Sequence, residues 1–144
     1  EIYLWVGGRG NIPKYAAKAK RMGIGKFVRF TGMIKENLPH LYRSADLFVL
    51  PSKFDTFGIV VIEALASGLP VIISKTTGAE FLRESESLIS RIFVLKDDEN
   101  LSDFMGACLE KTGFSSENDD AITEITNTEN KMLAFYLKSL HFNP

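Results

Sequence analysis

The chain has 144 residues, 45% of them hydrophobic and 24% charged, and its formal net charge is -1. This composition is typical of a globular domain with a core of its own. The small net charge gives no sign of a nucleic-acid partner or of a polybasic membrane anchor. Cys108 is the only cysteine, so no disulfide forms within the chain, which fits a reducing compartment.

Apolar runs alternate with helical patterns over the first 111 residues. Short apolar runs predict buried strands over residues 2–6, 27–30, 46–50, 70–74 and 91–95. Helical spacing predicts helices over residues 13–22, 38–44, 58–66, 78–84 and 101–111. Because the strands are apolar rather than alternating, they fit a parallel sheet covered on both faces. The prediction is a doubly wound parallel sheet, a Rossmann-like α/β fold.

The predicted organisation is a single α/β domain over residues 1–144. An apolar, strand-like run follows Glu1 directly, so we expect a longer protein and a domain that is truncated at its N-terminal end. Residues 115–130 are polar and acidic, which is typical of a solvated loop. Residues 132–140 are apolar again, so residues 115–144 are expected to form a polar loop and a C-terminal helix.

Ligands of an open parallel sheet bind beyond the carboxyl ends of its strands, and three segments fall there. The first, Gly7 to Gly10, lacks the full G-x-G-x-x-G spacing, and a plain strand-to-helix turn accounts for its glycines. The second holds Met33 and Ile34, which would either rest against a planar base or fill the end of the sheet.

The third segment, residues 51–58, joins an acid to the start of a helix. The first N–H groups of a helix have no partner within it, and they favour an anion. Phe57, Gly58 and Ile59 would supply these groups. Asp55 would either accept a hydrogen bond from a sugar hydroxyl or cap the helix.

Glu63 stands inside this apolar helix, with four apolar residues before it and three after it. A helix that is apolar nearly all round is buried, and a buried carboxylate needs a partner. Together with Asp55 and the helix start, Glu63 would bracket a phosphorylated sugar; the alternative is a structural ion pair.

Residues 47–71 carry a motif that resembles glycosyltransferase family 4. The motif runs through Leu47-Phe48-Val49-Leu50-Pro51-Ser52, Asp55-x-Phe57-Gly58 and Glu63-Ala64-Leu65-Ala66-x-Gly68-x-Pro70-Val71. Similar segments at Trp5-Val6-Gly7-Gly8, Phe30-Thr31-Gly32 and residues 41–46 extend the resemblance over residues 2–95. The resemblance implies a retaining enzyme of the GT-B type, of which this chain would be the C-terminal, donor-binding half.

The resemblance also implies roles for single residues. Glu63 would hydrogen-bond the ribose of a nucleoside-diphosphate sugar, and Asp55 would contact the transferred sugar. The backbone of Phe57, Gly58 and Ile59 would lie near the diphosphate and the sugar. Ile34, after the second strand, would lie against the base.

Two departures from the family pattern bear on activity. Asp55 stands where the family has a glutamate, and its carboxylate is set back by one carbon–carbon bond, about 1.5 Å. A displacement of that size lowers a rate by about two orders of magnitude unless something compensates. The basic pair that neutralises the diphosphate lies upstream in the family, so Arg9 and Lys53 are expected to be surface charges. The isolated fragment is therefore expected to be inactive.

The implied reaction moves a sugar from a nucleoside-diphosphate sugar to an acceptor hydroxyl, without metal or cofactor. The acceptor, whether glycan, lipid or small molecule, would bind through a missing N-terminal domain. The implied location is the cytoplasm, where only the missing domain would touch a membrane face. No cluster has metal-ligand spacing, and His40 and His141 are expected to be structural or solvated.

Three alternatives remain. A non-catalytic nucleotide-sugar-binding module would keep the fold and lose turnover, which the change at Asp55 permits. A nucleotide-sugar epimerase shares the GT-B architecture, although the motif from Asp55 to Glu63 argues against it. A nicotinamide-dependent dehydrogenase has less support, because the phosphate fingerprint after the first strand is incomplete.

Overall fold

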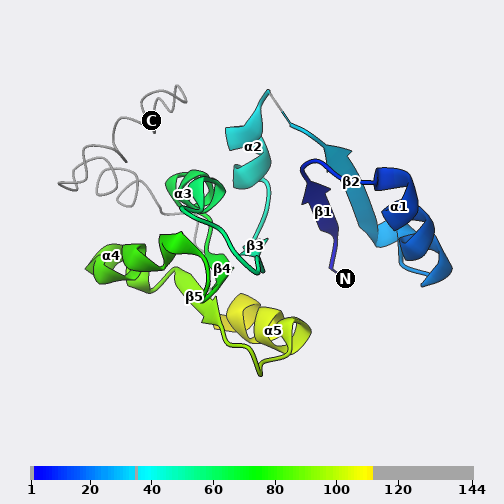
Figure 1. The fold of residues 1–144 in the computed structure, drawn as a ribbon. Coiled ribbons are helices and arrows are strands. Elements are labelled where there is room, and N and C mark those ends of the chain that lie inside the picture. The colour runs from blue at the N-terminus through cyan, green and yellow to red at the C-terminus, as the bar shows by residue number, and fades with distance from the viewer. Residues whose placement is uncertain (1, 35, 112–144) are drawn as a thin grey trace. The chain divides into compact units, whose positions relative to one another are not determined.

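The computed structural model describes residues 2–34 and 36–111 (Figure 1). Its strands are β1 (Leu4–Gly7), β2 (Val28–Gly32), β3 (Phe48–Leu50), β4 (Val71–Ser74) and β5 (Ile92–Leu95). Its α-helices are α1 (Ile12–Arg21), α2 (Leu38–Arg43), α3 (Ile59–Ala66), α4 (Glu86–Ile89) and α5 (Leu101–Lys111). Two 3-10 helices complete the set, η1 (Gly25–Phe27) and η2 (Gly78–Glu84).

The five predicted strands and five predicted helices are present, with small shifts at their ends. Residues 78–84 form a 3-10 helix rather than an α-helix, and neither η1 nor α4 was predicted. The predicted loop over residues 115–130 and the predicted C-terminal helix lie outside the described residues.

Contacts within the chain divide it into two compact units, Glu1–Leu38 and Pro39–Pro144. In the first unit β1 pairs in parallel with β2, with Leu4 opposite Val28. In the second unit the strand order is β3-β4-β5, again parallel throughout. The parallel α/β class is therefore confirmed, and the described strands form two sheets. A single domain over residues 1–144 stays a prediction.

The core of the second unit lies between α3 and its sheet. α3 packs on β3, β4 and η2, and it is apolar nearly all round because it is covered on most sides. It ends where Gly68 adopts a φ of 86°, the left-handed conformation that commonly stops a helix. The fully buried side chains include Val61, Ile62, Leu65, Val71, Ile72, Ile73 and Leu88.

The first unit is much less enclosed. Asn11 begins α1 by accepting a hydrogen bond from the N–H of Lys14 at 3.1 Å. Leu4, Trp5 and Val6 of β1 are 44%, 50% and 37% exposed, although all three are apolar. The prediction of a buried first strand is therefore wrong in its burial. Within the described part of the chain, β1 pairs with β2 alone, so too few neighbours cover it.

Two further observations concern the helices. No helix in the described ranges combines the length and the apolar character needed to cross a membrane. Cys108 is buried on α5, and this burial raises the pKa of its thiol.

Candidate functional site

The loop between β3 and α3 contains a turn that the Asp55 side chain closes. Asp55 Oδ1 accepts a hydrogen bond from the N–H of Phe57 at 3.1 Å and another from the N–H of Gly58. Aspartate favours this geometry because its short side chain reaches backbone groups two or three residues onward. α3 itself begins at Ile59, with Gly58 as an N-cap that has no side-chain hydrogen bond. Asp55 thus closes the turn before the helix rather than capping the helix.

This turn changes which N–H groups a ligand would meet. Of the three predicted donors, Phe57 and Gly58 already donate to Asp55. Among the described residues, no hydrogen-bond partner is found for the N–H groups of Ile59 and Val60. An anion at the start of α3 would therefore meet Ile59 and Val60 unless the carboxylate of Asp55 turned away.

A second loop, which follows β4, holds the turn in place. The N–H of Gly78 donates to the carbonyl of Asp55 at 2.9 Å, and the N–H of Asp55 donates to the carbonyl of Thr76 at 3.4 Å. The hydroxyl of Thr76 donates to the carbonyl of Ser52 at 2.9 Å, and the hydroxyl of Ser74 donates to the same carbonyl. The loops after β3 and β4 are therefore bonded to each other along their length.

Two glycines allow these loops to approach so closely. A Cβ atom on Gly78 would overlap the carbonyl oxygen of Thr56. A Cβ atom on Gly58 would lie 2.9 Å from the Cβ of Ala79 and 3.0 Å from Cγ2 of Thr77, and Gly58 also has a φ of 67°. Glycine is required at both positions, since any side chain would push one loop from the other.

Glu63 is held by a different partner, in the interior. It lies on α3 with 5% of its surface exposed. The hydroxyl of Tyr42, on α2, donates to Glu63 Oε2 at 3.0 Å. The Tyr42 ring meets Phe48 edge to face, with centroids 5.7 Å apart. The prediction that Glu63 is buried and partnered is confirmed, and the sequence pattern did not indicate Tyr42 as a partner.

Ile34 lies in the first unit, Glu1–Leu38. It is half-buried after β2, and a Cβ atom on Gly7 would lie 3.7 Å from its Cδ1 atom. The N–H of Gly8 donates to the carbonyl of Gly32 at 2.8 Å, so the Gly7 turn and Ile34 meet where β1 and β2 end. Met33 is 53% exposed. Contact between Ile34 and a base stays a prediction.

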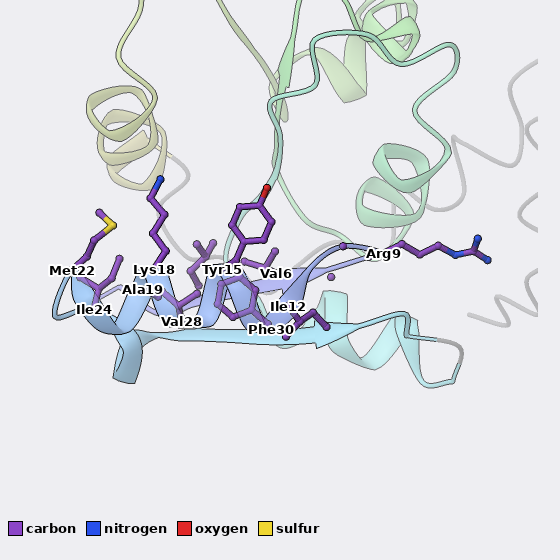
Figure 2. A pocket seen from close by; sticks show the side chains of 14 residues that line it. Val6, Arg9, Ile12, Tyr15, Lys18, Ala19, Met22, Ile24, Val28 and Phe30 are labelled. Atoms are coloured by element: carbon purple, nitrogen blue, oxygen red, sulfur yellow. The ribbon is translucent and has the colours of Figure 1, made fainter.

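The first unit also contains an open cavity of about 380 Å³ (Figure 2). Its lining is mostly apolar and comes from α1, β1 and β2, with Tyr15, Val28 and Phe30 among its members. It reaches the Gly7 to Gly10 turn, where the side chain of Arg9 extends away from the other labelled side chains. An apolar lining does not suit a phosphate, which favours the interpretation of these glycines as a plain turn.

The described residues offer no obvious metal centre or general base. Across residues 2–34 and 36–111, no three His, Cys, Asp or Glu side chains converge on one point. His40 is exposed on α2, and His141 lies outside the described residues. The absence of a metal requirement stays a prediction.

Comparison with known proteins identifies the family. Residues 1–111 match the family model of the group 1 glycosyl transferases. This chain belongs to that family. Among its relatives, mannosylfructose-phosphate synthase from Agrobacterium fabrum is 45% identical over 58 residues, which are 40% of this chain and 13% of that protein. D-inositol 3-phosphate glycosyltransferase 2 from Catenulispora acidiphila is 43% identical over 61 residues, 42% of this chain and 14% of that protein.

Solved glycosyltransferase structures share the fold. WaaG, a glycosyltransferase involved in lipopolysaccharide biosynthesis, superposes with a TM-score of 0.70 at 19% identity, over 99% of this chain and 38% of its own. Anabaena HepE in complex with UDP-glucose superposes with a TM-score of 0.69 at 24% identity, and the match covers 95% of this chain and 41% of the HepE chain. Both are GT-B glycosyltransferases, which confirms the predicted fold class. The chain spans less than half of either structure and a smaller part of the relatives named above.

Proposed function

We propose that this chain is the donor-binding domain of a retaining glycosyltransferase and works as part of a longer protein. Family membership supports glycosyl transfer as the reaction. The observation that carries the proposal is the position of residues 55–63, which follow a strand of a parallel sheet at its carboxyl end. Ligands of such sheets bind there. The complex of HepE with UDP-glucose supports a nucleoside-diphosphate sugar as donor.

Each predicted site residue has a role in this proposal. Glu63 accepts hydrogen bonds from ribose hydroxyls through the carboxylate that also accepts from the hydroxyl of Tyr42. Asp55 and the backbone of residues 57–59 lie near the diphosphate and the transferred sugar. Ile34 rests against the base. These groups orient the donor rather than exchange protons with it.

The chemistry is the replacement of one bond to the anomeric carbon by another. The bond to the diphosphate oxygen breaks, and the acceptor oxygen bonds to the same face of the sugar. The acceptor proton passes to the departing diphosphate. The N-terminus of α3 stabilises the charge that develops on this leaving group, so the step needs no metal.

The remainder of the longer protein supplies the acceptor site in this proposal. It binds a glycan, a lipid or a small molecule, and it makes any contact with a membrane face from the cytoplasm. It also covers the apolar side chains of β1 that are exposed in the chain as described, such as Trp5.

Ligand-observed NMR on this chain tests the donor pocket. UDP and GDP are each titrated into the wild type and into Glu63→Gln, which keeps an acceptor for Tyr42 but removes the charge. We expect one nucleotide to bind, and Glu63→Gln to weaken it by about tenfold. The control Glu110→Gln alters an exposed carboxylate on α5 and leaves binding unchanged. If neither nucleotide perturbs the wild type, the pocket does not exist in this chain.

A non-catalytic binding module is the second candidate, because Asp55 is shorter than the glutamate expected at its position and is engaged in a turn. The longer protein separates the two candidates when it is supplied with a panel of nucleotide sugars. Release of nucleoside diphosphate that collapses in Glu63→Gln supports the enzyme. Binding without release supports the module.

A further inference from the structure

We infer that Asp55 is a positioning residue, whose carboxylate fixes the backbone that presents α3 to the donor. The inference rests on the proposed function, since it assigns to Asp55 a part in donor binding that acts through the backbone. It differs from direct contact with the transferred sugar, because the oxygen that acts is already bonded inside the chain.

The first observation is that one oxygen atom holds two consecutive N–H groups. Asp55 Oδ1 accepts from both Phe57 and Gly58, and the residue is half-buried. Two donors on one ionised acceptor form charge-assisted hydrogen bonds, which are stronger than neutral ones. They set the direction in which the chain enters α3 at Ile59.

The second observation is that the main chain of Asp55 is held as firmly as its side chain. Its N–H and its carbonyl both bond to the loop after β4, through Thr76 and Gly78. A parallel bridge also joins Asp55 to Thr77, which is 2% exposed. With its backbone fixed on one side, the carboxylate has a defined position from which to reach the two N–H groups.

Side-chain length then decides which residue closes this turn. Aspartate and asparagine place an oxygen at the distance that the turn requires. Glutamate carries one more methylene, so its carboxylate would have to fold back on itself to reach the same N–H groups. Aspartate in place of glutamate at this position therefore allows the turn to close. Its effect is not limited to the loss of a contact with the sugar.

Variants at Asp55 separate positioning from contact. The full chain is prepared as wild type, Asp55→Asn, Asp55→Ala and Asp55→Glu, with Asp98→Ala as a control at an exposed acid of the same unit. Amide hydrogen exchange of Phe57 and Gly58 reports the turn without any ligand. The affinities for UDP and for UDP-glucose then report the site with and without the sugar.

We expect Asp55→Ala to speed exchange of both amides by roughly fivefold or more, because the loss of such a side-chain acceptor frees its donors. It should weaken UDP and UDP-glucose by the same factor, and Asp55→Glu should resemble it. Asp55→Asn should restore most of the protection and of the two affinities, since an amide oxygen accepts the same hydrogen bonds without the assistance of a charge. Asp98→Ala should match the wild type.

Two results would overturn the inference. One is unchanged exchange in Asp55→Ala, which would show that the turn does not depend on the side chain. The other is a loss of UDP-glucose affinity in Asp55→Asn with UDP affinity intact, which would show that the charge contacts the sugar. If the wild type binds neither UDP, GDP nor UDP-glucose while the exchange pattern is as expected, the proposed function fails and the turn itself is supported.

Discussion

Strands β1 and β4 are both short, apolar and parallel to their neighbours, yet their surroundings differ completely. Ile72 in β4 has no exposed surface, whereas Leu4 and Trp5 in β1 are 44% and 50% exposed. β4 has a strand on each side and α3 over it. In the described part of the chain, β1 has β2 alone. An apolar run shows that a strand is suited to burial, and the surrounding layers decide whether it is buried.

Truncation of one side chain in each strand tests this difference most directly. Ile72→Ala removes a fully buried side chain and is expected to lower the free energy of unfolding by about 4 kcal/mol. Leu4→Ala removes a side chain that already meets water, so we expect a loss below about 1 kcal/mol. Urea denaturation measures both. Equal losses would mean that β1 is packed as tightly as β4.

Glycines in the two units should also respond differently. Gly78→Ala would place a methyl group against the backbone of Thr56. Backbone atoms cannot rotate out of the way as the end of a side chain can, so we expect the free energy of unfolding to fall by about 3 kcal/mol. Gly10→Ala is the matched change in the first unit, where a Cβ atom meets nothing within 4 Å. Thermal unfolding compares the two variants. A stable Gly78→Ala would contradict the tight approach of the two loops.

Tyrosine hydroxyls give a third comparison. Tyr42→Phe leaves the buried carboxylate of Glu63 without one of its donors, and we expect a cost of about 2 kcal/mol. Tyr15→Phe changes a side chain of α1 that is 51% exposed, and it should have no measurable effect on unfolding. Wild-type stability in Tyr42→Phe would indicate that this hydroxyl adds nothing to the interior.

The smallest expected effect concerns helix starts, which should behave alike in both units. Asn11 accepts from the N–H of Lys14 before α1, and Asn100 accepts from the N–H of Ser102 before α5. Alanine at either position should cost about 1 kcal/mol. Denaturation followed by circular dichroism measures both, with serine variants as controls that retain a cap. Separate transitions for the two variants would show that the units unfold independently.

Local features of the fold were predictable because they depend on neighbouring residues. The apolar pattern of residues 59–66 and the glycine after it define α3 without reference to the rest of the chain. The exposure of Trp5 was not predictable, because burial depends on which layers surround a strand. The region of the candidate site was predictable as well, because residues 47–71 are consecutive and their motif can be recognised along the sequence.

The internal geometry of the site depended on contacts between distant residues. Tyr42 and Glu63 are 21 positions apart, and nothing in either helical pattern indicates that they meet. The bond between Gly78 and Asp55 likewise joins loops after different strands. The turn at Asp55 was closer to prediction, because aspartate two or three residues before free N–H groups is a known turn pattern. The alternative in which Asp55 caps the helix identified a local role for its side chain, although Asp55 bonds to the N–H groups of Phe57 and Gly58, which precede α3.

The close approach of Gly78 to Thr56 has a consequence for protein engineering. The segments after β3 and β4 pack directly against each other. A larger residue at the contact in one segment would require the backbone of the other to move. If the chain binds a sugar donor as proposed, redesign of its donor preference would have to vary both segments together, as one library.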